Sequence, residues 1–365
     1  MKNFCGHEIE WVWTMRKLNT PLSVSSYVPG TAFGGKNFDY PMHLSATWYN
    51  HGDIYFDREE ITVIGAFLQY NIEQDKTYPC RIAKRVFSLA RRIDVRKIRG
   101  TDGVSLPKLI KLFQKERKDF LVMTGFMSYR GSVQMGDILH EKLKTMLVGR
   151  LGRKGQMSRL AACLEILSYP MYESIIVAEK KFILQQARMF SGASERRQEE
   201  IIGGYLSRYA WIAYHWFVGT PPSRDEISGR LITFASAANE ELKTLIHEQE
   251  TAESKIRKVI MDLRLNSAER DLVRDYRTWL FIRSCVKDSI NKAGYKLLPI
   301  LYAIAERVGI EPASIPYLTL QEIDSIKTIP RRDLERHIEA RRGGFSAGII
   351  HNRFRFGSFN ASRVE

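Results

Sequence analysis

Apolar residues recur at spacings of three and four from about residue 78 to residue 330, where prolines are sparse. This spacing places apolar side chains on one face of a helix, so it predicts a mainly α fold, a multi-helix bundle. Before this region, "LSVSSYV" (22–28) and "WYNHGDIYFDREE" (48–60) are typical of short strands, the second a hairpin turning at residues 51–53. After residue 343 the pattern alternates with period two, which predicts a C-terminal β-hairpin turning at residues 351–352. We therefore expect a helical bundle with a small α/β N-terminal segment and a C-terminal hairpin.

Local signals also predict where helices begin and end. A Ser, Asn or Thr stands three residues before a glutamate at the expected helix starts Ser223/Glu226, Asn266/Glu269 and Thr319/Glu322. Such capping boxes satisfy backbone amides that have no partner within the helix. The helix that starts at Asn266 is long, from about 267 to 308, with Pro299 as an expected kink. We expect loops or helix ends at "TGFMSYRGSVQMGD" (124–137) and at "VGRLGRKGQ" (148–156), the latter a basic helix end followed by a glycine cap or an anion contact.

These patterns divide the chain into four segments. We expect a small α/β entry segment at 1–77, a basic helical region at 78–200, a helical domain at 201–342, and a hairpin with a tail at 343–365.

The stretch "YLSRYAWIAYHWFVGTPPSRDEI" (205–227) has six aromatic residues in its first thirteen positions. Projected on a single helix, its apolar bulk covers most of the circumference, which predicts a largely buried helix. Arg208, Trp211 and His215 remain together on one face. They are candidates for a pocket that binds an anionic or aromatic ligand. The alternative is a polar edge with Trp211 wedged against a neighbouring helix.

The formal net charge of +15 adds an expectation about partners, because it favours acidic ones such as nucleic acid or an acidic subunit. Residues 81–100 hold eight Lys or Arg against one Asp. Four apolar residues share one helical face there (Ile82, Val86, Leu89 and Ile93), and most of the basic side chains, among them Arg81, Lys84, Arg91 and Arg92, lie off it. This helix is either a solvated basic face or a face that docks an anion.

A second basic stripe lies on the long helix, at Arg270, Arg274 and Arg277, with Arg283 further on. Acidic residues interleave with it, which is typical of a solvated face with ion pairs. Arg274, Arg277 and Arg283 join the trio above as candidate substrate-binding residues.

Motifs for catalysis or metal binding are weak. "GTAFGGKN" (30–37) has Asn37 where a phosphate-binding loop needs Ser or Thr, and "GFSAG" (344–348) lacks suitable partners for a nucleophilic Ser346. The four cysteines have no zinc-binding spacing and are expected to be reduced thiols. With no secretory h-region and no apolar run near 18 residues, we expect a cytoplasmic protein without a membrane span. No catalytic residue, metal site or cofactor is assigned to this chain.

Several segments together resemble the central helical region of phosphoenolpyruvate-utilising enzymes, the group around phosphoenolpyruvate synthase. The first is "YLSRYAWIAYHWFVGTPPSRDEI", similar to an aromatic helix followed by Gly-x-Pro and a capped helix. The second is residues 274–323, with an arginine-rich helix, an "IA-x-R-x-G" turn and a "YLT-x-x-EI" helix start. Arg341-Arg342 before the hairpin continues the likeness, and residues 13–23 and 52–57 look more loosely like its entry.

The resemblance implies a role in an enzyme system that transfers phosphoryl groups. In such enzymes an ATP-grasp module phosphorylates a histidine on a mobile domain, and the helical region lies between modules and in some members binds the acceptor. This chain shows no ATP-grasp module, and we expect it to end where the mobile domain would begin. "GGFSAGIIH" departs from the histidine motif GGxxSHxA, since Ala347 follows Ser346; His351 is therefore not assigned the phosphohistidine role.

The leading hypothesis is therefore a non-catalytic or partly catalytic component of a split phosphoenolpyruvate-utilising phosphotransferase system. It would bind an anionic small-molecule substrate or dock ATP-grasp and phosphohistidine-domain proteins, with ATP, Mg and phosphoenolpyruvate acting through those partners. The alternative is a basic helical nucleic-acid-binding protein, which rests on charge alone because no nucleic-acid-binding motif accompanies it. An independent transferase in the helical bundle is a third possibility, for which the sequence supplies no reaction.

Overall fold

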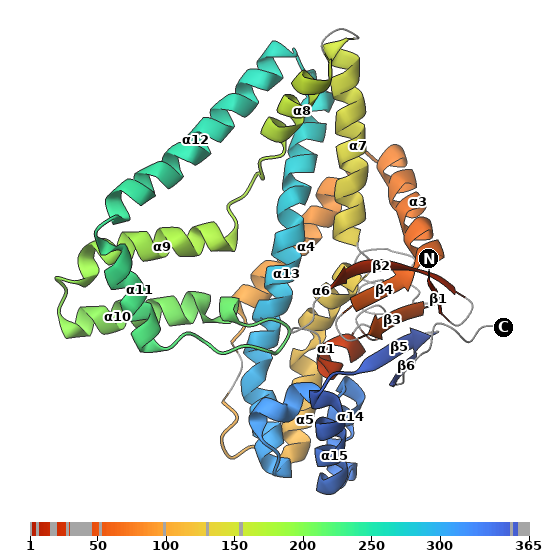
Figure 1. Ribbon diagram of the computed structural model, residues 1–365, viewed down its shortest axis with the longest axis vertical. Coiled ribbons are helices and arrows are strands. Elements are labelled where there is room, and N and C mark those ends of the chain that lie inside the picture. The colour runs from red at the N-terminus through yellow and green to blue at the C-terminus, as the bar shows by residue number, and fades with distance from the viewer. Residues whose placement is uncertain are drawn as a thin grey trace. The chain divides into compact units, whose positions relative to one another are not determined.

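The computed structural model describes residues 2–4, 7–14, 20–26, 29, 46–50, 53–97, 100–128, 131–152, 156–350 and 353–356. The chain packs as two compact units (Figure 1). Unit 1 comprises residues 1–131, 214–219 and 289–365, and unit 2 comprises residues 132–213 and 220–288. The four-segment division made from the sequence stays a prediction.

Helices dominate the described chain, as the apolar spacing predicts. In unit 1 they are α1 (Pro21–Ser25), α3 (Arg58–Gln74), α4 (Tyr78–Val95), α5 (Leu106–Glu116), α6 (Lys118–Ser128), α14 (Leu320–Asp324) and α15 (Arg331–Arg342), with short 3-10 turns at Pro312–Tyr317 and Ile326–Thr328. In unit 2 they are α7 (Gly131–Leu151), α8 (Gln156–Leu167), α9 (Ile175–Phe190), α10 (Glu195–Tyr209), α11 (Arg224–Ala235) and α12 (Ala238–Asp262), with a 3-10 turn at Ala210–Ala213. The long helix α13 (Ser267–Val308) contributes residues to both units and continues through Pro299. The mainly α fold class is confirmed.

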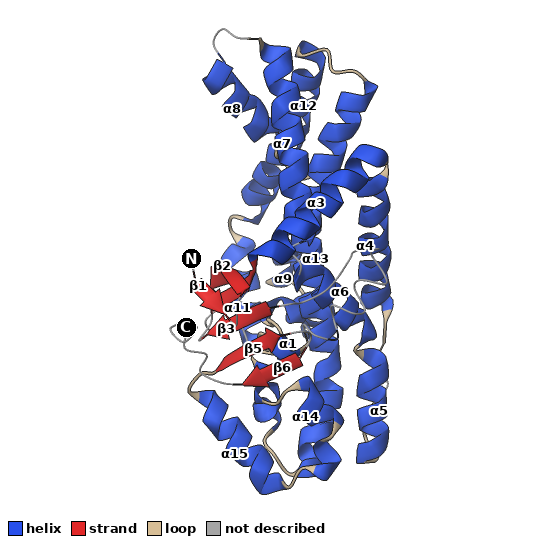
Figure 2. Ribbon diagram, turned by 90° about the vertical axis from the view of Figure 1, so that its right-hand side faces the viewer, coloured by secondary structure: helices blue, strands red, loops and turns tan. Residues whose placement is uncertain are grey.

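Unit 1 also contains one antiparallel sheet built from both ends of the chain. Its strands are β1 (Lys2–Phe4), β2 (His7–Thr14), β3 (Ala46–Asn50), β4 (Asp53–Asp57), β5 (Ser346–Ile350) and β6 (Arg353–Phe356). Their order in the sheet is β1-β2-β4-β3-β5-β6, so the C-terminal hairpin pairs through β5 with β3 (Figure 2). The small N-terminal α/β segment and the C-terminal hairpin, expected separately, therefore form a single sheet.

Both predicted hairpins are present. β3 pairs with β4 and Asn50 lies opposite Asp53, and β5 pairs with β6. The central residues of the two expected turns, 51–52 and 351–352, lie outside the described residues, as does the glycine-rich stretch 30–37. Ser346 begins β5, so it does not occupy the strand-to-helix turn that a nucleophilic serine requires.

One predicted strand is a helix instead. Residues 21–25, within the "LSVSSYV" region, form α1, because Thr20 and Ser23 make a capping box and Pro21 occupies the first turn. The apolar side chains of α1 are buried, and Ser25 Oγ accepts a hydrogen bond of 2.9 Å from the Leu320 amide at the start of α14.

The stretch 124–137 contains helix ends, as predicted, because α6 ends at Ser128 and α7 begins at Gly131. Gly125 and Gly136 lie inside these helices and do not end them. Met123, Phe126 and Met135 are fully buried, and this burial outweighs the low helix propensity of glycine. The second expected helix end is confirmed: α7 stops at Leu151, and Gly152 follows with φ of 70°.

The core of unit 2 lies among α9, α10 and α11 and the start of α12. Its buried residues are Ile183, Leu184, Ala187, Phe190, Ile201, Ile202, Tyr205, Ile227, Leu231 and Ala238. A buried polar group sits within it, because Tyr205 donates a hydrogen bond of 2.6 Å to Glu179 and receives one of 2.8 Å from Arg230. Burial and the Glu179 hydrogen bond raise the pKa of Tyr205 to about 12. The network satisfies a carboxylate that would be costly to bury alone.

No helix in the described part of the chain is long and apolar enough to cross a membrane. Cys80, Cys163 and Cys285 are present as thiols.

Candidate functional site

The aromatic stretch does not form one continuous helix. α10 ends at Tyr209, a 3-10 turn covers Ala210–Ala213, and His215 and Val218 then pair across a tight turn. Trp216 and Phe217 are the central residues of this turn and have φ of 51° and 74°. Positive φ at both central positions is typical of two-residue hairpin turns and costs about 1 kcal/mol or more for a residue with a side chain. The prediction of a single buried helix over this stretch is therefore wrong, although its aromatic residues are largely buried.

Burial of the two rings offsets the backbone cost of this turn. Trp216 and Phe217 are 1% and 3% exposed, and both pack on Phe120 of α6 with ring centroids 6.2 and 4.9 Å apart. The Phe217 ring packs beside Gly294 of α13, where an added Cβ would lie 3.5 Å from the ring, an ordinary van der Waals contact. The helix restart predicted at Ser223 is confirmed by a complete capping box, whereas the preceding helix stops at Tyr209 and not at Gly219, which has φ of 141°.

The three polar candidates of this stretch do not share a helical face. Arg208 ends α10 on an exposed position, where its guanidinium lies over the Phe182 ring at 5.4 Å. Trp211 is 4% exposed, and its indole nitrogen donates a hydrogen bond of 2.7 Å to the carbonyl of Arg208. His215 belongs to unit 1, whereas the other two belong to unit 2. The helix break at Tyr209 removes the geometry on which their grouping depended.

The arginines of α13 separate into exposed and buried groups. Arg270, Arg274 and Arg283 are exposed, and Arg274 pairs with Asp271 at 2.8 Å, as a solvated face predicts. Arg277 is only 7% exposed, so the expectation of a wholly solvated stripe is wrong there. Its guanidinium donates to the carbonyl of Tyr169 at 2.8 Å and forms an ion pair with Glu253 of α12.

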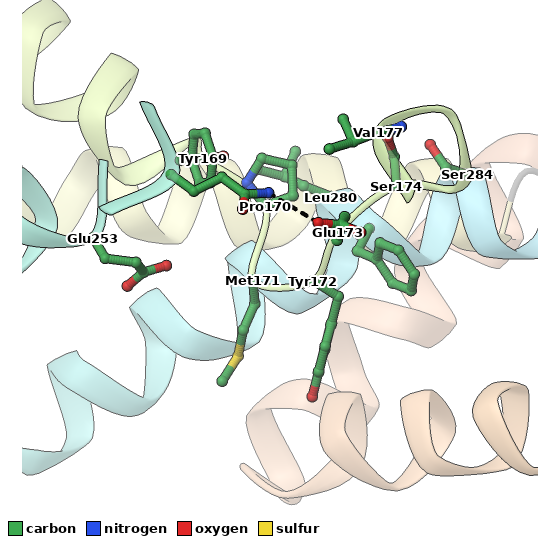
Figure 3. Close-up of a pocket in the computed structure, with 12 residues that line it drawn as sticks. Tyr169, Pro170, Met171, Tyr172, Glu173, Ser174, Val177, Glu253, Leu280 and Ser284 are labelled. Carbon is green, nitrogen blue, oxygen red and sulfur yellow. Dashed lines mark hydrogen bonds between the residues drawn. The ribbon is translucent and has the colours of Figure 1, made fainter. Parts of the chain in front are cut away.

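A cleft in unit 2 has a volume of about 420 Å³ (Figure 3), and two of the residues that line it, Tyr169 and Glu253, are the ones that Arg277 contacts. The loop between α8 and α9 forms one wall, and α12 and α13 form the others. The lining residues are Tyr169, Pro170, Met171, Tyr172, Glu173, Ser174, Val177, Gln249, Glu253, Leu280, Phe281 and Ser284. A second cleft, of about 510 Å³, lies between α8 and α12 and shares Tyr169.

Aromatic and apolar groups dominate the accessible surface of the first cleft. Tyr172 is 44% exposed and Met171 is 40% exposed, and in Figure 3 their side chains extend in the same direction from the loop. The rings of Tyr172 and Phe281 lie 5.3 Å apart at 56°. Exposed aromatic and thioether groups beside a concavity are suited to holding the apolar part of a ligand.

The charged groups of the cleft are already neutralised by the protein. Glu173 pairs with Lys181 and accepts a hydrogen bond of 3.2 Å from Gln249, and Glu253 pairs with Arg277. These pairs fix the walls of the cleft without leaving a strong field of either sign in it. The arrangement is suited to binding, and it presents no aligned nucleophile and base among the described lining residues.

Arg277 is a candidate from the sequence, whereas the cleft is not predicted by any sequence pattern. The stretch "SYPMYES" (168–174) carried the available signal, because a proline between two tyrosines interrupts the helical pattern and Ser174 then caps α9. The partners on α12 and α13 are about 80 to 115 residues away in the chain, so no local pattern joins them to this loop. Among the described residues no group of His, Cys, Asp or Glu is arranged to hold a metal ion.

Comparison with protein-family models, with curated proteins and with solved structures finds no match to this chain.

Proposed function

We propose that this chain is the central helical component of a split phosphoenolpyruvate-utilising phosphotransferase system. In this role it acts in the cytoplasm, holds an acceptor molecule and docks separately encoded ATP-grasp and phosphohistidine-domain proteins. ATP, Mg and phosphoenolpyruvate belong to those partners.

The main support is that two of the motif segments behind the resemblance lie against each other. "YLT-x-x-EI" supplies Glu322 and the Arg341-Arg342 segment supplies Arg341, which donates to the Glu322 carboxylate at 2.7 and 2.9 Å. Thr319 of the first motif caps α14 with the same Glu322. These contacts join two of the segments on which the resemblance rests into one packed unit, which supports reading them together.

The cleft in unit 2 supports a binding role for the chain. Its aromatic and thioether surface suits the apolar part of an acceptor, and Ser174, Gln249 and Ser284 supply polar groups that can orient one. The buried Arg277 is occupied by Glu253 and a carbonyl, and Arg274 is paired with Asp271, so neither supports an anionic substrate in the cleft.

Radiolabelled phosphoenolpyruvate and ATP test the proposal directly. The purified chain alone should neither take up label on histidine nor hydrolyse ATP. If an ATP-grasp protein and a phosphohistidine protein are encoded beside its gene, adding both should produce phosphoryl transfer to an acceptor that requires this chain. Label on a histidine of the isolated chain, or equal transfer when the chain is omitted, would contradict the proposal.

A matched pair of variants tests whether the cleft holds the acceptor. Tyr172→Ala should raise the KM for the acceptor about tenfold or more, because it removes an aromatic wall worth about 1 to 3 kcal/mol. Tyr70→Ala removes a similarly exposed tyrosine from α3 in unit 1 and should leave the KM unchanged. Equal effects of the two variants would remove the cleft from the proposal while leaving the docking role intact.

A further inference from the structure

Exposed lysines that have no acidic partner gather on α5 and the start of α6. Lys108, Lys111, Lys115 and Lys118 are all exposed, and none forms an ion pair with a residue that the structure describes. They occur at spacings of three and four, which places them on neighbouring turns. We name these four residues the lysine surface; α5, which carries three of them, runs along the lower right edge in Figure 2.

The opposite face of α5 explains why this surface is exposed. Leu109, Ile110 and Phe113 are between 0% and 6% exposed and anchor the helix in unit 1. The lysines therefore occupy the solvent side of an amphipathic helix whose orientation is set by its apolar side.

The nearby acidic side chains face inward and do not neutralise the lysines. Glu116 and Asp119 have side chains only 12% and 8% exposed. Arg96 contacts both carboxylates, at 3.2 and 3.0 Å, and Arg92 contacts Asp119 at 2.8 Å. Since both carboxylates pair with arginines at the end of α4, they do not neutralise the lysines, and the solvent side of this region keeps its positive charge.

The end of α4 adds to the same positive region. Residues 91–97 hold four basic residues against Asp94, and Asp94 pairs with Lys292 of α13 at 2.5 Å. Lys296 donates to the carbonyls of Ile93, Asp94 and Arg96 at 2.7 to 2.8 Å, which neutralises the negative end of the α4 dipole. Arg91 and Lys97 remain exposed without a described ion partner.

The composition of this surface favours a nucleic acid over an acidic protein. Protein interfaces have an apolar centre, and on α4 and α5 Val95 is the one large apolar side chain among the described residues that is strongly exposed. Lysines three or four residues apart are separated by about 5 to 6 Å along a helix, a spacing that allows successive contacts with a row of phosphates. No exposed aromatic residue accompanies the described lysines, so base stacking is not part of this surface.

We propose that the lysine surface binds the phosphate backbone of duplex nucleic acid without reading its sequence. Affinity comes from the release of counterions by Lys108, Lys111, Lys115 and Lys118, with Arg91 and Lys97 extending the contact. This binding is independent of the phosphotransferase role proposed above and concerns unit 1, whereas the acceptor cleft lies in unit 2.

Fluorescence anisotropy of a labelled 24-base-pair duplex, titrated with the full chain at 50 and 200 mM KCl, tests the proposal. The four lysine contacts alone predict that affinity falls about 100-fold between the two salt concentrations, and the contacts of Arg91 and Lys97 make the fall steeper. Replacing all four lysines with glutamine should reduce the salt slope by about 3 to 4 and abolish most of the binding at 50 mM KCl. Two duplexes of unrelated sequence should bind equally.

A second quadruple variant distinguishes binding by the lysine surface from a general effect of net charge. Lys144, Lys243, Lys255 and Lys258 are exposed lysines of unit 2, and replacing them with glutamine removes the same four charges. This variant should keep the wild-type affinity and slope. Equal loss in both variants would show a diffuse effect of net charge and would overturn the proposal.

Two further outcomes would also overturn it. One is no binding of the duplex at 50 mM KCl. The other is binding of labelled poly-L-glutamate through the four lysines with a higher affinity than the duplex, which would assign the surface to an acidic protein. Thermal unfolding of each variant confirms that the fold is retained, as expected for substitutions at exposed positions.

Discussion

Arg341 of α15 holds Glu322 of α14 with both ends of its guanidinium group, Nη1 to Oε2 at 2.7 Å and Nη2 to Oε1 at 2.9 Å. The two side chains are 10% and 15% exposed. Nη1 also donates to the carbonyl of Tyr317 at 2.9 Å, and the guanidinium covers the ring of Phe356 on β6 at 3.9 Å. One residue thus ties α14, α15 and the edge of the sheet together within unit 1.

Arg341→Ala is expected to destabilise the protein by about 3 kcal/mol, because it leaves Glu322 buried without its main partner. Arg341→Lys should recover part of this loss, since lysine keeps the charge but not the two-point contact. Arg331→Ala breaks an exposed i,i+4 pair with Glu335 on the same helix and should cost less than about 1 kcal/mol. Calorimetric unfolding of the three variants measures these differences, and similar losses for Arg331→Ala and Arg341→Ala would contradict the structural role of the buried pair.

The same pair predicts an acid dependence of stability. Burial raises the pKa of Glu322, but hydrogen bonds from Arg341 and Thr319 outweigh it and leave the pKa below its ordinary value of 4.5. Because the folded-state pKa is the lower one, the stabilisation is complete above about pH 4.5 and is lost as the pH falls through the folded-state pKa. The difference in stability between the wild type and Glu322→Gln, followed by urea unfolding, should therefore shrink between pH 6 and pH 3. A constant difference over this range would show that Glu322 does not titrate as its contacts require.

Two arginines of α13 allow the stability contribution of a buried arginine to be compared with that of an exposed one. Arg277→Ala should destabilise the protein by about 2 to 3 kcal/mol, because it orphans the Tyr169 carbonyl and removes the partner of Glu253. Arg283→Ala, on an exposed position of the same helix, should change stability by less than about 0.5 kcal/mol. Urea unfolding compares them, and a silent Arg277→Ala would mean that the buried contacts contribute little.

Two glycine-to-alanine substitutions are expected to have opposite signs. At Gly294, inside α13, an added Cβ meets the Phe217 and Phe120 rings at 3.5 to 3.8 Å, which is ordinary contact, so Gly294→Ala should stabilise by about 0.5 to 1 kcal/mol. At Gly309, φ is 75° and a Cβ would lie 3.0 Å from Arg331 Nη1, so Gly309→Ala should destabilise by about 1 kcal/mol or more. Melting temperatures that move in the same direction for both variants would contradict this account.

Asp288 predicts a stability change in the opposite pH direction. Burial raises the pKa of this carboxyl from 3.8 to about 6. A raised carboxyl pKa means that ionisation at neutral pH opposes folding, so Asp288→Asn should stabilise the protein at pH 7 by about 1 to 3 kcal/mol. The gain should disappear near pH 4, where the wild-type carboxyl is protonated in the folded state. Unfolding at the two pH values measures this, and a gain that does not depend on pH would exclude desolvation of the carboxylate as its cause.

Local patterns predicted the mainly helical region and several helix starts correctly. The capping boxes at Ser223, Asn266 and Thr319 form with the predicted partners, and α13 has the predicted limits of 267 and 308. The apolar face of α4, from Ile82 to Ile93, is buried as its spacing predicts. These features depend on interactions over three to seven residues, so short-range sequence contains them.

The aromatic stretch at 205–217 shows where such patterns fail. A helical projection assumes a regular backbone, and the positive φ values of Trp216 and Phe217 occur because Phe120 and Gly294, about 75 to 100 residues away, accommodate their rings. The grouping of Arg208, Trp211 and His215 failed for that reason. The strand predicted at 22–28 is wrong because the capping box of Thr20 and Ser23 and the proline at position 21 favour a helix over residues 21–25.

Spacing and caps within the chain were enough to define a mainly helical protein, two hairpins and the amphipathic faces of α4 and α13, since each arises from neighbours in sequence. Folding in three dimensions decided which charges remain available. In the folded protein, buried ion pairs neutralise the charges of Arg277, Arg341, Glu116 and Asp119, whereas the lysines of α5 face solvent. Folding also joined β3 to β5 across some 300 residues and formed the cleft beside Tyr172, because contacts between distant segments depend on how apolar faces pack and not on any local pattern.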